Sequence, residues 1–178
     1  MKKISWGSMA EAQSDETRRQ QRKLQEARSD AITFLGLAKK PSGRVASRLR
    51  DAGFPDDLIQ EVLKELKEEG YLDDLQIARR MVRQRHGRQA ESRFALRQRM
   101  LQAGLIPEAV ETAMEEAMTD HELARDLIGT RFTRELAELG QENMSRQDKQ
   151  RLSLRIARFL AGRGFDSELI RKTLRLDD

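Results

Sequence analysis

The fold of this chain is decided by residues 70–105, which read GYLDDLQIARRMVRQRHGRQAESRFALRQRMLQAGL. The spacing of the apolar residues predicts two helices in this stretch. Between residues 75 and 104 it holds eight arginines and one acid, Glu91, a net charge of 8 − 1 = +7. The flanking segments are acidic: residues 54–74 carry 2 − 8 = −6, and residues 105–126 carry 1 − 7 = −6. Parts of the pattern recur on both sides, which indicates that this basic stretch is the central unit of a repeat.

A short motif that marks a helix–turn–helix corner occurs three times, at residues 52–59 (AGFPDDLI), 103–110 (AGLIPEAV) and 163–170 (RGFDSELI). In each, a helix ends at glycine, an apolar residue follows, and a new helix begins with acids. Glycine can adopt the left-handed conformation that closes a helix, and the apolar residue after it can fold back onto that helix. We therefore expect Gly53, Gly104 and Gly164 to occupy equivalent positions in three units.

The apolar pattern around these corners predicts three helices in each unit. The glycines are separated by 104 − 53 = 51 and 164 − 104 = 60 residues, so the third unit holds an insertion of 60 − 51 = 9 residues. We expect this insertion as a loop within residues 137–147. The predicted fold is all-α, an elongated array of three tandem three-helix repeats at residues 31–73, 74–119 and 120–178. A leader at residues 1–30 is expected to be disordered or to form a frayed helix.

The composition favours such thin repeats over one deep core. Hydrophobic residues make up 38% and charged residues 36% of the 178 residues, and amphipathic helices that each bury one stripe need few apolar residues per turn. The absence of cysteine excludes disulfides, zinc–thiolate sites and a cysteine nucleophile. Without cysteine the cytoplasm is the default location, and because no apolar run reaches the length of a signal peptide or a membrane span, we expect no membrane contact. We also expect a monomer.

The residues give no support to an enzymatic or metal-binding function. Neither His86 nor His121 has a second metal ligand three or four residues further along, as a helical metal site would require. The chain also lacks a glycine-rich dinucleotide motif and a phosphate-binding loop. We expect no catalytic residue, no metal ligand and no cofactor.

The arginines are the candidate binding residues. Helices that enter the corners are basic and helices that leave them are acidic, so positive charge is expected along one surface, as is typical of nucleic-acid binding. Arg79 and Arg83, like Arg93 and Arg97, are four residues apart, so each pair projects from one helix face and can clamp phosphates or carboxylates. The alternative is that the arginines only form ion pairs with the acidic helices beside them. The candidates are Arg79, Arg80, Arg83, Arg85, Arg88, Arg93, Arg97 and Arg99 in the centre, with Arg44, Arg48, Arg155 and Arg158 at the flanks.

The leader contains a second basic cluster within residues 14–29, where Leu24 is the one large apolar residue. This segment is either a basic arm that contacts a partner or a solvated tail, and the residues alone leave both open. The cluster consists of Arg18, Arg19, Arg22, Lys23 and Arg28.

Two groups of residues together match the pattern of a known family. They are Gly70, Tyr71, Leu72, Asp73, Asp74, Ile77, Ala78, Val82, Arg85, Gly87, Leu96, Met100, Gly104 and Leu105, followed by Arg158, Phe159, Leu160, Arg163, Gly164, Phe165 and Ile170. Through these residues the chain resembles, over about residues 30–175, the RecX family of bacterial recombination regulators. Family members usually have an aromatic residue where Ile77 stands, and commonly an acid where Ala46 and Arg99 stand, so contacts at these positions are expected to differ.

The resemblance implies a partner that charge and spacing do not name. RecX proteins are built from three-helix repeats, bind the RecA filament on single-stranded DNA, lodge in its groove, and inhibit its ATPase and strand exchange. For this chain the resemblance implies a regulator of RecA in recombination, DNA repair and the SOS response, which contacts single-stranded DNA directly or through RecA.

Two other functions stay open beside this one. The chain could be a helical-repeat module that binds the DNA phosphate backbone without an obligatory protein partner, or it could be a purely structural scaffold. Under the RecA hypothesis the central contact is formed by Arg79, Arg83, Arg93 and Arg97. Reversal of Arg93 and Arg97 to glutamate is then expected to abolish RecA inhibition at unchanged thermal stability.

Overall fold

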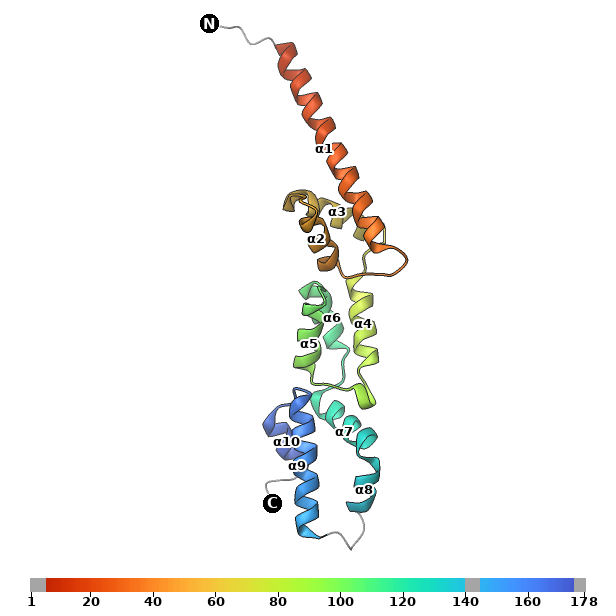
Figure 1. Cartoon of the computed structure of the whole chain (residues 1–178), viewed down its shortest axis with the longest axis vertical. Helices are drawn as coiled ribbons and strands as arrows, with labels where there is room; N and C mark the ends of the chain where they lie inside the picture. The colour runs from red at the N-terminus through yellow and green to blue at the C-terminus, as the bar shows by residue number, and fades with distance from the viewer. Residues whose placement is uncertain (1–5, 140–144, 175–178) are drawn as a thin grey trace. The chain divides into compact units, whose positions relative to one another are not determined.

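The computed structural model describes residues 6–139 and 145–174, and all regular structure in these ranges is helical (Figure 1). This confirms the predicted all-α class. Two compact units make up the chain, Met1–Asp73 and Asp74–Asp178. The elements are α1 (Trp6–Leu35), α2 (Ser42–Asp51), α3 (Asp56–Glu68), α4 (Asp74–Gln84), the short 3-10 helix η1 (Gly87–Gln89), α5 (Arg93–Gln102), α6 (Pro107–Glu115), α7 (Asp120–Arg131), α8 (Thr133–Leu139), α9 (Arg146–Gly162) and α10 (Ser167–Leu174).

The N-terminal unit contains α1, α2 and α3, which each bury one apolar stripe in a shared core. The buried residues follow the three- and four-residue spacing of helices, so they lie on one face of each helix. The core consists of Ala27, Ala31 and Leu35 from α1, Val45, Ala46 and Leu49 from α2, Ile59, Val62 and Leu66 from α3, and Leu72 after α3.

Helix α1 is much longer than the core that it covers. It begins at Trp6, inside the stretch expected as a leader. Among its residues 15–35 the first fully buried one is Ala27, with Leu24 partly buried one turn earlier. All side chains from residue 15 to residue 23 are exposed. Residues 1–5 lie outside the described residues. The described part of the leader is therefore helical and continues without a break into the first helix of the core.

The C-terminal unit contains two apolar cores. Helices α4, α5 and α6 surround one core, and helices α7, α9 and α10 surround the other. Together with the core of the N-terminal unit, these cores are compatible with three three-helix repeats. The first consists of Ile77, Ala78, Val82, Leu96, Met100, Leu105, Val110, Ala113 and Met114, and the second of Ala90, Leu123, Ala124, Leu127, Ile128, Phe132, Leu152, Ile156, Leu160, Phe165 and Ile170.

The segment expected as the third repeat, residues 120–178, has one helix more than the sequence predicted. Helix α8 lies between α7 and α9 in the chain, at the start of the expected insertion. Of the loop expected at residues 137–147, residues 137–139 belong to α8, residues 146–147 belong to α9, and residues 140–144 lie outside the described residues. Helical structure therefore extends into both ends of the expected loop.

The three glycine corners have the predicted geometry. Gly53, Gly104 and Gly164 have φ angles of 89°, 92° and 82°, in the left-handed region that favours glycine. In each corner the N–H of the next residue donates to a carbonyl five residues earlier, at 3.1 to 3.2 Å. This bond folds the apolar residue back onto the helix that has just ended. The bonds run from Phe54 to Leu49, from Leu105 to Met100, and from Phe165 to Leu160.

The third corner packs directly against the start of α5. A Cβ atom at Gly164 would lie 2.9 Å from Ser92 Oγ and 3.1 Å from Ala95 Cβ, so a larger residue would displace this segment. The Ser92 N–H donates to the Arg163 carbonyl at 3.0 Å, and the Arg163 guanidinium donates to the Ala90 carbonyl at 3.3 Å. These contacts fix the start of the arginine-rich helix α5 within the C-terminal unit.

Candidate functional site

The one acid of the arginine-rich segment is buried and binds two of its arginines. Glu91 is 4% exposed, and its carboxylate accepts hydrogen bonds from Arg99 Nε at 3.0 Å and Arg99 Nη2 at 2.8 Å. The Nε atom of Arg85 lies 3.2 Å from the same carboxylate. The hydrogen bond and the charge of Glu91 raise the pKa of Arg99. Because a buried carboxylate must be paired to be stable, Arg85 and Arg99 have a structural role beside Glu91.

Arg93 stabilises the end of α6. Its guanidinium donates to the carbonyl oxygens of Met114 at 2.7 Å, Ala117 at 2.7 Å and Met118 at 3.2 Å. Carbonyls at a helix C-terminus lack their usual N–H partners, and the helix dipole favours a cation there. The Arg93 N–H also donates to Asp120 Oδ1 at 2.6 Å, at the start of α7. Reversal of Arg93 would remove the three guanidinium bonds, so the structure gives a reason to expect a loss of stability in the double reversal of Arg93 and Arg97.

Arg79 and Arg97 form ion pairs with the acidic helix α6. Arg79 on α4 donates to Glu116 at 2.6 and 2.8 Å, and Arg97 on α5 donates to Glu111 at 2.7 Å, with a second nitrogen at 2.6 Å. All four side chains are 40% to 53% exposed. Pairing with a neighbouring acidic helix, the alternative interpretation of the arginines, therefore holds for these two.

Three arginines of the central segment direct their charge to solvent. Arg80 and Arg83 on α4 are exposed, and no acid in the described part of the chain pairs with either. They are three residues apart and so share one helix face. Arg88 in η1 is also exposed, and its Nε atom has one long contact, 3.4 Å from the Thr130 carbonyl. These three side chains are the part of the predicted basic surface that is available to a partner without first breaking an ion pair.

The flanking candidates divide in the same way. Arg44 in the N-terminal unit and Arg158 in the C-terminal unit are exposed, with no acidic partner among residues 6–139 and 145–174. Arg48 binds Asp30 at 2.9 Å. Arg155 binds Glu135 at 3.0 Å, and its guanidinium lies 5.5 Å from the centre of the Phe132 ring.

Phe94 is an exposed aromatic residue that the sequence reasoning did not single out. It is 67% exposed at the second position of α5, and helical spacing places it away from Leu96 and Met100, which face the core. The sequence signal is a large apolar residue off the buried stripe of its helix. Because single exposed apolar residues are common on protein surfaces, Phe94 alone assigns no function.

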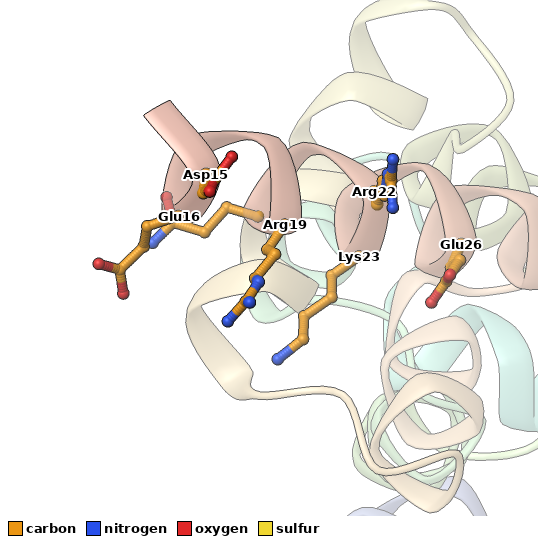
Figure 2. Close-up of a pocket in the computed structure, with 7 residues that line it drawn as sticks. Asp15, Glu16, Arg19, Arg22, Lys23 and Glu26 are labelled. Carbon is orange, nitrogen blue, oxygen red and sulfur yellow. The ribbon is translucent and has the colours of Figure 1, made fainter. Parts of the chain in front are cut away.

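Metal-binding groups, membrane-spanning helices and surface depressions also bear on function, and the described residues are informative on each. The described residues contain no group of three or more His, Cys, Asp or Glu side chains that could hold a metal ion. Within the same residues, no helix is long and apolar enough to cross a membrane. A depression on α1 (Figure 2) takes its lining from this one helix, so its walls are a row of surface side chains: Asp15, Glu16, Arg19, Gln20, Arg22, Lys23 and Glu26.

The exposed cap at the start of α7 contains an acid with a shifted pKa. Thr119 Oγ1 accepts a hydrogen bond from the Glu122 N–H at 3.3 Å, and the Glu122 carboxylate accepts from the hydroxyl and the N–H of Thr119 at 2.7 and 2.8 Å. The side-chain bond from Thr119, followed by the backbone bond, lowers the pKa of Glu122. The cap is therefore a local structural device rather than a catalytic carboxylate.

Solved structures with similar folds are RecX proteins. One, described as regulatory protein RecX, has a TM-score of 0.62 at 18% identity and covers 94% of this chain and 78% of its own. RecX from Lactobacillus salivarius has a TM-score of 0.62 at 15% identity and covers 86% of this chain and 95% of its own. At these identities the likeness establishes a shared fold.

Sequence relatives establish the family. No family model matches the chain. Regulatory protein RecX of Stenotrophomonas maltophilia is 29% identical over 171 residues, 95% of this chain and 98% of the relative. Regulatory protein RecX of Prosthecochloris aestuarii is 29% identical over 81% of this chain and 88% of the relative. Regulatory protein RecX of Chromohalobacter salexigens is 31% identical over 148 residues, 83% of this chain and 90% of the relative. With this identity over nearly the whole of both proteins, the chain belongs to the RecX family of regulatory proteins.

Proposed function

We propose that this protein regulates homologous recombination and DNA repair by binding the RecA filament on single-stranded DNA. In this proposal it lodges in the filament groove and inhibits the ATPase and strand-exchange activities of RecA. Family membership supports the partner, and the exposed arginines support the chemistry of the contact. The observation that carries the proposal is that Arg80 and Arg83 are exposed on one face of α4 without an acidic partner in the described residues.

The proposed contact surface differs from the set chosen by helical spacing alone. Arg80, Arg83 and Arg88 form its centre, because their guanidinium groups are exposed. Arg158 in the same unit and Arg44 in the N-terminal unit are exposed and are proposed as additional contacts. Phosphate and carboxylate groups are both suitable partners, since guanidinium binds either with paired hydrogen bonds.

In this proposal Arg79 and Arg97 also contact the filament, each after releasing its acidic partner within the protein. Both ion pairs are about half exposed, and such pairs contribute only about 0–1 kcal/mol each. A phosphate or a carboxylate of the filament can therefore replace Glu116 or Glu111 at low cost. The three carbonyl bonds of Arg93 and the ion pairs of the buried Glu91 are kept on binding. They stabilise the helices that carry the contact surface.

The test is an assay of RecA ATPase on single-stranded DNA with increasing amounts of this protein. The wild-type protein is expected to inhibit. For the same inhibition, the variant R80E/R83E is expected to require a concentration at least about tenfold higher than the wild type, because two exposed ionic contacts become repulsive. The matched control is K64E/K67E, which makes the same charge change on the exposed, acidic helix α3; it is expected to inhibit like the wild type.

Each result assigns a different failure. No effect of the wild-type protein on RecA ATPase would overturn the proposed function. Full inhibition by R80E/R83E would leave the function standing and overturn the proposed surface. Equal loss in R80E/R83E and K64E/K67E would mean that net charge, and not the α4 face, controls the inhibition.

The second candidate is a module that binds the DNA backbone without RecA. The exposed positions of Arg44, Arg80, Arg83 and Arg88 favour it, because these groups would meet phosphates directly. Tight binding of DNA without RecA, weakening steeply with salt, combined with no effect on RecA ATPase, would select this function.

A further inference from the structure

The exposed half of α1 carries a basic cluster that the proposed contact surface does not use. Residues 17–25 read TRRQQRKLQ and contain four cations and no acid. Every side chain from residue 15 to residue 23 is exposed, whereas the same helix is buried at Ala27, Ala31 and Leu35. We name residues 17–25 the α1 arm.

The cations of the arm and the next arginine on the same helix, Arg28, differ in their ion pairs. Arg28, in the packed half of α1, lies 2.6 Å from Glu69 and 3.8 Å from Glu65 on α3. In the arm, the one ion pair formed among the described residues is the 3.8 Å approach of Arg18 to Asp15, and both side chains are about 70% exposed. Arg28 is thus paired within the fold, whereas Arg19, Arg22 and Lys23 form no ion pair among the described residues, although the exposed acids Asp15, Glu16 and Glu26 flank the arm.

The four cations form two parallel rows. Arg18 and Arg22 are four residues apart, as are Arg19 and Lys23, so each row has a spacing of about 6 Å along the helix axis. Figure 2 shows the Arg19 and Lys23 side chains extending to the same side of α1. Two such rows present positive charge at a regular spacing, which suits a repeating anion.

The side chains between the cations distinguish a nucleic-acid partner from a protein partner. The hot spots of protein interfaces are enriched in Trp, Tyr and Arg, and they cluster in fully desolvated pockets. The only large apolar residue of the arm is Leu24, which is partly buried against the core of the N-terminal unit. Its exposed neighbours Gln20 and Gln21 are polar, and contacts to a phosphate backbone need only cations and polar donors.

We propose that the α1 arm is a second binding site, separate from the arginines of the repeats, and that it binds the phosphate backbone of single-stranded DNA through Arg18, Arg19, Arg22 and Lys23. The choice of single-stranded DNA rests on the proposed function, which brings this polymer beside the protein. The arm recognises no base sequence, because it has no exposed aromatic residue for stacking.

The experiment measures binding of a fluorescein-labelled single-stranded oligonucleotide to the full chain without RecA, at a series of salt concentrations. Each phosphate neutralised contributes about 0.7 to the slope of log K against log salt. The variant R18Q/R19Q/R22Q/K23Q is therefore expected to lower the slope by about 3, so that a fourfold rise in salt weakens the wild type about 50-fold more than the variant. Glutamine is a comparable helix former, and unchanged circular dichroism verifies the fold.

A matched pair of double variants controls for net charge. R19Q/K23Q removes two cations from the arm and is expected to lower the slope by about 1.4. K64Q/K67Q removes two exposed cations from α3, where Lys64 lies 4.0 Å from Glu68, and is expected to leave the slope unchanged.

Several results would overturn the proposal. An unchanged slope in the quadruple variant, or no binding by the wild type without RecA, would make the arm a solvated helix. An equal change in slope on duplex DNA would overturn the assignment to single strands. An unchanged slope with loss of RecA ATPase inhibition would assign the arm to a protein surface. A changed slope with no effect of the wild type on RecA ATPase would support the arm and refute the proposed function.

Discussion

Arg93 and Arg97 are one helical turn apart on α5, yet the structure predicts very different effects for their replacement by alanine. Arg93→Ala removes three hydrogen bonds from a guanidinium to the carbonyls of Met114, Ala117 and Met118. A hydrogen bond from a charged donor contributes about 1.5–3 kcal/mol, and a cation at a helix C-terminus about 0.3–1 kcal/mol. Because the three bonds share one guanidinium, their contributions are not additive.

We therefore expect Arg93→Ala to lower the free energy of unfolding by about 2–4 kcal/mol. Arg97→Ala removes one ion pair with Glu111, in which both side chains are at least 40% exposed, and is expected to cost about 0–1 kcal/mol. Urea unfolding followed by circular dichroism measures both values. Each variant replaces one arginine of the same helix by alanine, so each serves as the control for the other.

Equal losses of stability in the two variants would refute this reasoning. Such a result would mean that the Arg93 guanidinium does not hold the end of α6, and Arg93 would return to the set of exposed binding candidates. If the predicted difference is observed, loss of function in an Arg93 variant reports on folding, and function has to be tested at Arg80 and Arg83.

Two further predictions concern two glycines with a left-handed backbone and the stability of the fold at acid pH. Gly164→Ala is expected to cost more than Gly87→Ala: both need a left-handed backbone at a cost of about 1–2 kcal/mol, but a Cβ at Gly164 meets atoms at 2.9 and 3.1 Å, whereas at Gly87 the nearest atom is 3.6 Å away. Equal unfolding free energies in urea would contradict the tight packing at Gly164. The lowered pKa of Glu122 means that its cap stabilises the fold above the pKa of the unfolded chain, and that this contribution is lost as pH falls through the lower folded value. Thr119→Ala is expected to reduce this pH dependence in urea unfolding series; an identical dependence in the variant would show that the cap is not coupled to Glu122 ionisation.

The positions of the corners were predictable because their causes are local. A left-handed glycine and the apolar residue after it act within one helical turn, so Gly53, Gly104 and Gly164 could be recognised from short motifs. The helices of the cores followed from the three- and four-residue spacing of apolar residues. Helix α8 was missed because it leads into the insertion and overlaps its first three residues, where the comparison between repeats has no counterpart.

The roles of the arginines were not predictable from spacing. Helical spacing grouped Arg93 with Arg97, but the partners of Arg93 lie 21 to 25 residues away, after the α5–α6 corner. The partner of Arg79 is 37 residues away. Which of eight neighbouring guanidinium groups reaches a carbonyl, a buried carboxylate or solvent depends on the packing of α4, α5 and α6 against one another.

The sequence by itself determined the all-helical class, the corners and, through its relatives, the RecX family. These depend on backbone conformation and apolar spacing, which are set by residues close together in the chain. Only the tertiary structure decided which charges are already used inside the fold: Glu91 binds Arg85 and Arg99, Arg93 closes α6, and Arg80 and Arg83 are left exposed. The physical reason is that a charge is neutralised by whatever the fold brings within a few ångströms, and that distance is not encoded in any short segment of the chain.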